Sequence, residues 1–296
     1  MLKGKSITFV AVTYAIIAAL FYGLSAPLSK LLLNELSPYT MSSLLYFGAG
    51  IGMLCVIFIR RTKPKEVIQS FHSNDVKYIV LMIILDIVAP ILLMFGLLNT
   101  TASTAALLNN FEIIFTGLIA MVFFKEHIGR KMWIAITIIL LSGMILSFED
   151  FSGFHVSIGA LFVMAASLSW GLENNCTRML SKNDPLYVVI LKGLGSGTGA
   201  LIIAITLNDF GGPWLYILFA LLLGFFSYGL SLYFYISAQR HLGALRTSAY
   251  YSTAPFAGAI FSFLILSESL TYPFVIAFML MALGTYLAIK ENNNEQ

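Results

Sequence analysis

The chain has 296 residues, of which 59% are hydrophobic and 10% are charged, with a mean hydropathy of +0.89 and a formal net charge of +3. A soluble domain carries about 25% charged residues, so this composition excludes a water-soluble globular protein and indicates an integral membrane protein. The basic residues lie in short loops between apolar runs, so the positive charge gives no reason to expect nucleic-acid binding.

Ten apolar segments are long enough to cross a membrane, which takes about 20 residues for a hydrocarbon core of about 30 Å. They do not alternate polar with apolar residues, as β-barrel strands do. The predicted fold class is therefore an all-α integral membrane protein with ten transmembrane helices. Short turns such as Asn99-Thr100 should make antiparallel neighbours of the spans that they join, here spans 3 and 4. The spans are residues 9–29, 37–59, 76–98, 101–124, 128–148, 156–180, 185–207, 213–237, 244–267 and 270–290.

Lysines and arginines collect at one set of span ends. If the N-terminus is inside, 15 of the 17 basic residues fall on the cytoplasmic side. Of the other two, Lys30 falls outside and Lys192 lies within a span. This is the distribution that the positive-inside rule describes, so both termini are predicted to be cytoplasmic.

The sequence repeats itself at a spacing of about 142–148 residues. AMVFFKEHI matches SFLILSESL with Glu126 opposite Glu268, and LFYGLSAPLSKLL matches LSWGLENNCTRML with Lys30 opposite Arg178. Each half has five spans, so the two halves should cross the membrane in opposite directions. Inverted repeats of this kind are typical of secondary transporters that work by alternating access.

Four charged residues fall inside spans: Asp86, Glu112, Glu173 and Lys192. A charge at the bilayer centre costs about 2.5–3.5 kcal/mol, so these side chains should face the bundle interior. At a rise of about 1.5 Å per residue, Asp86 and Glu112 both lie near the midplane. Burial disfavours two charged carboxylates at one depth, so one or both could exchange protons, whereas a cationic solute would hold both ionised.

Glu173 and Lys192 lie nearer the inner edge, at matching depth on spans 6 and 7. The favoured interpretation is a structural or gating ion pair, and an anion site at Lys192 is the alternative. A role in locking helices together stays open for Asp86 and Glu112 as well. Neither acid has a matching charge in the second half, since Asp86 pairs with Tyr228 in the repeat, and this asymmetry favours a specific role in the first half.

Amides and aromatic side chains inside the spans complete the candidate site for substrate or protons. Amides donate and accept hydrogen bonds, and aromatic rings can stack on a planar or cationic solute. Bonding between helices and ordinary packing or anchoring are the alternatives. The residues are Tyr22, Asn109, Asn110, Trp170, Asn174, Tyr228 and Tyr251.

Four segments resemble the EamA-type carriers of the drug/metabolite transporter superfamily, and the resemblance extends over essentially the whole chain. They are ALFYGLSAPLSKLLL, LLNNFEIIFTGLIAMVFFKEHIGRKMWIAITIILLSGMIL, SLSWGLENNCTRML and RTSAYYSTAPFAGAIFSFLILSESLTYPFVIAFMLMALG. In that family spans 4 and 9 often carry a proline. Here Pro255 is present in span 9, whereas Ile113 stands where proline is common in span 4.

The resemblance implies ten helices, a central cavity lined mainly by spans 1, 3, 4, 6, 8 and 9, and transport of small metabolites. With the repeat, it predicts two EamA domains, residues 1–149 with spans 1–5 and residues 150–296 with spans 6–10. It does not imply a particular solute, since members of the family carry very different ones.

The leading interpretation is a secondary active transporter of the cell membrane that moves an amino-acid-like, amine or other polar or amphipathic solute by alternating access. A proton gradient is one candidate driving force. The alternatives are a channel, or an enzyme or sensor built on the same bundle. The histidines are scattered, and there is no P-loop and no Ser-His arrangement, so no catalytic residue, metal or cofactor is expected. The expected partners are the solute, protons and the lipid bilayer.

Overall fold

The computed structural model describes residues 2–60, 75–125, 129–150, 155–180, 185–242, 247 and 250–292. Glu126, the predicted repeat partner of Glu268, lies outside these residues. The helices are α1 (Leu2–Gly23), α2 (Ser25–Leu32), α3 (Pro38–Arg60), α4 (Val76–Asn99), α5 (Ala102–Leu108), α6 (Phe111–Phe124), α7 (Arg130–Ser147), α8 (Ile158–Met179), α9 (Pro185–Thr206), α10 (Trp214–Gly224), the π-helix η2 (Phe225–Leu230), α11 (Ser231–Leu242), α13 (Ala254–Leu266) and α14 (Tyr272–Asn292). Two short strands, β1 (Phe148–Asp150) and β2 (His155–Val156), pair antiparallel between α7 and α8.

These helices correspond to the ten predicted spans. Span 1 consists of α1 and α2, span 4 of α5 and α6, and span 8 of α10, η2 and α11. In the described part of the chain, eight helical stretches are long and apolar enough to cross a membrane. The other two spans are α13, which has 13 residues, and α8, which carries Glu173 and Arg178 among its 22 residues. The predicted all-α membrane fold is thus confirmed.

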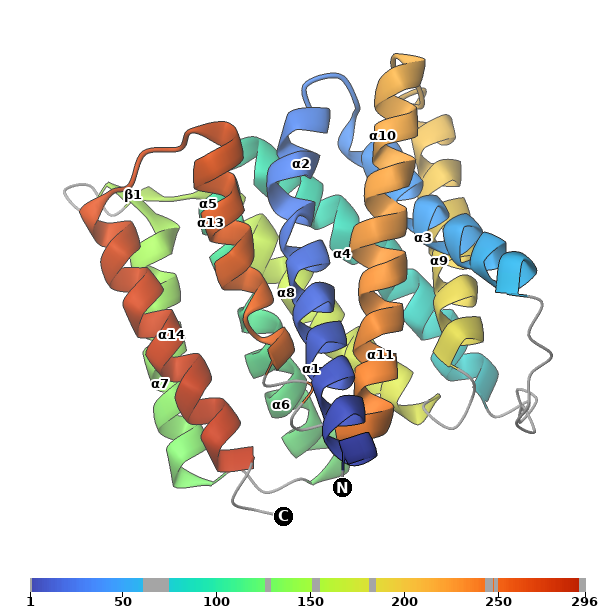
Figure 1. Cartoon of the computed structure of the whole chain (residues 1–296). Helices are drawn as coiled ribbons and strands as arrows, with labels where there is room; N and C mark the ends of the chain where they lie inside the picture. Colours follow the sequence, from blue (N-terminus) through green and yellow to red (C-terminus); the bar gives the residue numbers. More distant parts are fainter. Residues whose placement is uncertain are drawn as a thin grey trace.

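The helices form one bundle with both chain termini at the same face (Figure 1). We call this the terminal face, and the other, where α2 ends and α10 begins, the opposite face. α7 packs on α14 at one side of the bundle, and α3 packs on α9 at the other. Between these pairs, α4 and α6 pack on α8, and α11 and α13 pack on α1. Large side chains such as Phe111, Leu93 and Met94 fill the core and are almost fully buried.

Spans 3 and 4 are not side by side through the membrane, and that prediction was wrong. α8 packs against both α4 and α6, and the two spans contact each other chiefly where α4 meets α5 near their shared turn. Glycines let α8 come this close. A Cβ added at Gly96 would stand 2.6 Å from the Val163 side chain, and one added at Gly171 would stand 2.7 Å from Phe115 Cβ.

The two halves share local backbone features. Span 4 is interrupted by a turn at Asn109-Asn110, and span 9 by a turn at Ser252-Thr253. α6 ends at a left-handed residue, Lys125 with φ 56°, and α13 ends at Ser267 with φ 52°. Lys125 and Ser267 are 142 residues apart, which is the spacing of the sequence repeat.

Candidate functional site

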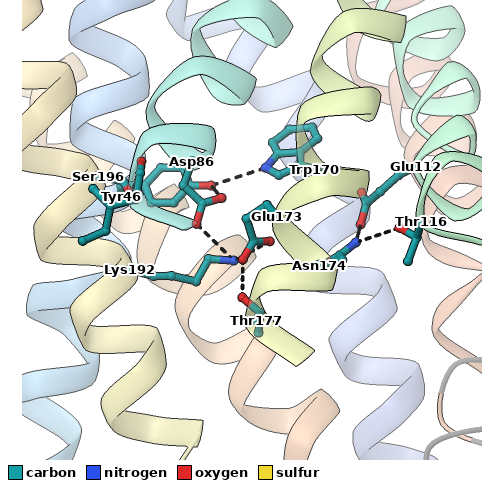
Figure 2. A network of polar contacts seen from close by, with 11 residues as sticks. Tyr46, Asp86, Glu112, Thr116, Trp170, Glu173, Asn174, Thr177, Lys192 and Ser196 are labelled. Atoms are coloured by element: carbon teal, nitrogen blue, oxygen red, sulfur yellow. Dashed lines mark hydrogen bonds and ion pairs between the residues drawn. The ribbon is translucent and has the colours of Figure 1, made fainter. Parts of the chain in front are cut away.

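Three charged side chains meet in the bundle interior, and we call them the ion cluster. Lys192 Nζ lies 3.2 Å from Asp86 Oδ2 and 3.0 Å from Glu173 Oε2. They come from α4, α8 and α9 (Figure 2). Asp86 is 0% exposed and Glu173 is 1% exposed, so bulk water screens neither carboxylate. Glu173 and Lys192 lie about two helical turns from the helix ends nearest the terminal face.

Neighbouring hydroxyls satisfy the carboxylate oxygens that Lys192 does not reach. Tyr46 of α3 donates from its hydroxyl to Asp86 Oδ1 at 2.8 Å. Thr177, one turn along α8, donates to Glu173 Oε1. Trp170 Nε1 points to the Tyr46 hydroxyl at 3.5 Å. Each of the four oxygens of the two acids therefore has a hydrogen-bond or ion-pair partner, which is what buried charges require; Asp86 Oδ2 has the Lys192 ammonium group and no hydrogen bond besides.

Glu112 lies on the other side of α8 from Asp86 (Figure 2), so the structure does not bring these two acids together. Its Oε1 accepts a hydrogen bond from Asn174 Nδ2 at 2.6 Å. Asn174 Nδ2 is also 3.3 Å from Thr116 Oγ1, and the neighbouring Asn175 donates to the Thr116 carbonyl at 3.2 Å. In the part of the chain that the structure describes, Glu112 has no ion-pair partner, unlike Asp86 and Glu173.

Tyrosine rings connect the ion cluster with the centre of the bundle. The centroids of Tyr46 and Tyr228 are 5.5 Å apart, those of Tyr228 and Tyr22 are 6.0 Å apart, and those of Tyr22 and Tyr251 are 5.9 Å apart. Ser25 Oγ donates to the Tyr228 hydroxyl at 3.3 Å. Three of the four aromatic residues proposed from the sequence thus lie in one row, and Trp170 joins it through Tyr46.

A small pocket lies between α1, α2, α4, α5 and α13, beside Tyr22. Measured for the centre of a water-sized sphere, its volume is about 10 Å³, which is room for about one water molecule. Small side chains form much of the wall, and Asn109 reaches it from the turn in span 4. The lining residues are Tyr22, Gly23, Ser25, Ala26, Leu93, Ala106, Asn109, Ala254, Pro255 and Gly258.

The asparagines of the span 4 turn are buried without being satisfied. Asn109 is 8% exposed and Asn110 is 1% exposed. Asn109 Oδ1 and both polar side-chain atoms of Asn110 have no hydrogen-bond partner. An unsatisfied buried polar group costs about 1–3 kcal/mol, so the two amides lower the stability of this turn as it stands.

Sequence patterns did not single out Tyr46, Thr116 or Thr177 as site residues. Tyr46 carries a hydroxyl in the apolar run LLYFGAG near the middle of span 2, and this was the available signal. Thr116 and Thr177 resemble the many other threonines within spans, and only their contacts with Asn174 and Glu173 distinguish them. Within the described residues there is no group of three side chains that could hold a metal ion.

Comparison with known proteins identifies the family. The model of the EamA-like transporter family matches residues 9–148 and again residues 157–290, and together the two matches cover most of the chain. Families of this kind are transporters, not enzymes.

Similar chains agree with the family match. An uncharacterized transporter of Methanothermobacter thermautotrophicus is 30% identical over 92% of this chain and 84% of its own length. An uncharacterized transporter of Clostridium kluyveri is 25% identical over 94% and 93%. A crystal structure of another protein has a TM-score of 0.65 at 15% identity, covering 96% of this chain and 95% of that one, which shows a shared fold. The chain belongs to the EamA-like transporter family and is a multi-pass membrane transporter.

Proposed function

We propose that this protein is a secondary active transporter of the cell membrane that moves a small polar or amphipathic solute by alternating access. The proposal rests on one observation: the buried polar contacts connect residues of the first half of the chain with residues of the second half. Asp86 and Tyr46 belong to the first half, and Glu173 and Lys192 to the second. Glu112 likewise bonds across to Asn174. A polar interface between two repeats is where an alternating-access transporter holds its solute and coupling ions.

Residues 1–149 and 150–296 are the two repeats of this proposal. An exchange of span n with span n+5 carries the observed helix pairs onto one another. The α3–α9 and α7–α14 pairs map onto themselves, and α4–α8 maps onto α11–α1. The α6–α8 pair maps onto α13–α1. This pattern supports a two-fold relation between repeats that cross the membrane in opposite directions.

Both termini are cytoplasmic in this proposal. They lie at the same face of the bundle (Figure 1), as ten spans require. Lys125 follows the end of α6 at that face, and Arg130 and Lys131 are the first residues of α7 there. The positive-inside rule assigns such a face to the cytoplasm. The opposite face is then extracellular.

Proton coupling is the driving force that the buried acids support best. Carboxylates deep in a bundle can take up and release protons as the site opens to one side or the other. Asp86 and Glu173 share a single lysine, and Glu112 has an amide for a partner. The acids therefore outnumber the bases in this interior, and a proton can balance the remaining charge.

Purified protein in liposomes tests the proposal. With an imposed pH gradient and a panel of radiolabelled amines, amino acids, nucleosides and sugars, we expect saturable uptake of at least one solute that collapses when a protonophore removes the gradient. Asp86→Asn and Glu112→Gln should each reduce the proton dependence, whereas Glu35→Gln, a change at an exposed carboxylate, should not. Flux that never saturates would indicate a channel instead, and a proton dependence that is unchanged in both variants would remove these acids from coupling.

A further inference from the structure

We propose that the pocket beside Tyr22 binds the primary ammonium group of the solute, with Glu112 as counter-ion and Asn109 Oδ1 as hydrogen-bond acceptor. This inference rests on the proposed transport function and names the chemical class of the solute.

The charge comes from Glu112. Of the three acids in the bundle interior, Asp86 and Glu173 already contact the ammonium group of Lys192. Glu112 has only the Asn174 amide as partner in the described chain. A carboxylate buried without a cation is costly, so a positively charged solute gains most by binding here. A cationic solute would gain less binding energy at Asp86 or Glu173, because it would first have to displace the ammonium group of Lys192.

Glu112 does not line the pocket itself, and span 4 connects it to a residue that does. Asn109, which lines the pocket, precedes Glu112 by three residues. Asn109 and Asn110 keep right-handed helical dihedral angles through the turn, and the Glu112 N–H bonds to the Asn109 carbonyl at 3.0 Å, so these two residues stay one turn apart along span 4. Glu112 is also close enough to Tyr22, Tyr228 and Tyr251 to act on their hydroxyl groups electrostatically. Tyr22 lines the pocket as well, so the carboxylate and the pocket share two neighbouring residues.

The acceptor is Asn109 Oδ1. Asn109 is 8% exposed, and this oxygen has no hydrogen-bond partner. An oxygen can be satisfied only by a donor, which a primary ammonium supplies and a quaternary ammonium lacks. The size of the pocket agrees, because room for about one water molecule suits an –NH₃⁺ group and not a trimethylammonium group. The rings of Tyr22 and its neighbours favour a cation over an anion.

Helix dipoles do not reverse this preference. α6 and α13 both begin near the pocket, and a free helix N-terminus carries about half a positive charge. Here each begins directly after another helical turn. Asn110 N–H bonds to the Leu107 carbonyl, and Thr253 N–H bonds to the Tyr250 carbonyl. The negative end of each preceding turn offsets the positive end of the next helix, so the full charge of Glu112 dominates.

Equilibrium binding to the full chain in lipid nanodiscs tests the proposal without requiring transport. The probes are benzylamine, benzyltrimethylammonium and benzyl alcohol at pH 7.5, measured by titration calorimetry. We expect benzylamine to bind at least tenfold more tightly than either of the others. Glu112→Gln and Asn109→Leu should each weaken benzylamine binding about tenfold or more, as expected for losing a hydrogen bond to a charged group. Glu35→Gln should bind as the unchanged protein does.

Asn109→Leu serves as the second variant if Glu112→Gln does not fold, and thermal unfolding verifies that each variant is native. Equal binding of the three probes, no binding of benzylamine, or unchanged binding in both folded variants would overturn the ammonium site. Saturable pH-driven uptake of another solute would then still support the transport proposal. Binding of benzylamine without saturable, pH-driven uptake of any solute would support the ammonium site and contradict the transport proposal.

Discussion

Lys192 occupies a central position among the buried charges of this transporter. Its ammonium group contacts Asp86 on one side and Glu173 on the other. Taking charges out of water costs several kcal/mol per ion, and only good geometry and further hydrogen bonds offset that cost. Tyr46 and Thr177 provide those bonds. The stability of the cluster therefore depends on all of its members at once.

Lys192→Met should be strongly destabilising, because removal of one partner from a buried ion pair typically costs about 3–5 kcal/mol. Adding Asp86→Asn to Lys192→Met should recover part of that loss, since Asn keeps a side chain that can bond to Tyr46 and removes one unpaired charge. Thermal unfolding of the detergent-solubilised variants measures both effects as a double-mutant cycle. If the double variant is no more stable than Lys192→Met alone, Asp86 and Lys192 are not coupled in the way the distances indicate.

At the residue scale the sequence was informative about which side chains are unusual, and less so about their partners. A charged residue inside an apolar span is easily recognised in the sequence, and this was so for Asp86, Glu112, Glu173 and Lys192. Depth along a helix predicted that Glu173 and Lys192 lie at one level. Depth also suggested that Asp86 and Glu112 lie close together, because both are near the midplane. Depth does not say on which side of the bundle a residue lies, and α8 in fact separates these two acids.

Among the elements, close backbone approach decides which helices can be neighbours. α3 crosses α10 with two glycines at the contact. A Cβ at Gly48 would stand 2.1 Å from the Leu221 carbonyl oxygen, and one at Gly224 would stand 2.1 Å from the Leu45 carbonyl oxygen. Backbone atoms cannot move aside as a flexible side chain can, so these two positions admit no side chain without separating the helices.

Gly224→Ala should destabilise the bundle by about 1–3 kcal/mol or more, which is the usual cost of overpacking a core. Gly117 in α6 is the matched control, because its nearest neighbour to an added Cβ is Met132 at 3.8 Å. Gly117→Ala should be neutral or stabilising by about 0.5–1 kcal/mol, since alanine loses less backbone entropy in a helix. Unfolding midpoints of the two variants provide the comparison. A similar loss in both would mean that the α3–α10 contact is not the cause of the loss at Gly224.

The existence of the elements was far more predictable than their interruptions. Apolar runs of about 20 residues suffice to locate spans, and the ten helical spans follow them closely. The turn at Asn109-Asn110 forms without any proline in span 4, and η2 lies in an apolar run with no sequence marker of its own. Such features follow from packing between helices that are far apart in the sequence, which local patterns do not contain.

For the molecule as a whole, charged side chains from both halves hold the turn between α4 and α5 at the opposite face. Glu268, just after α13, accepts hydrogen bonds from the Ala102 and Ser103 N–H groups at 2.7 and 3.0 Å. Lys30 of α2 donates to the carbonyls of Leu97 and Thr100. A carboxylate suits the N-terminus of α5 and an ammonium suits the C-terminus of α4. Residues from both halves thus hold one turn, and they lie between the pocket and that face.

Glu268→Gln should weaken these contacts and shift the protein towards a state in which the pocket opens at the opposite face. Loss of a capping side chain costs about 0.5–2 kcal/mol, and about 1.4 kcal/mol corresponds to a tenfold change in population. Leu93, a pocket residue that is 1% exposed, can report the opening as Leu93→Cys, after Cys55 and Cys176 have been replaced by serine. A membrane-impermeant maleimide added to intact cells should label this cysteine about tenfold faster in Glu268→Gln than in Glu35→Gln. In inside-out vesicles the labelling should not increase. Equal rates in the two variants from the cell exterior would show that Glu268 does not hold the opposite face closed.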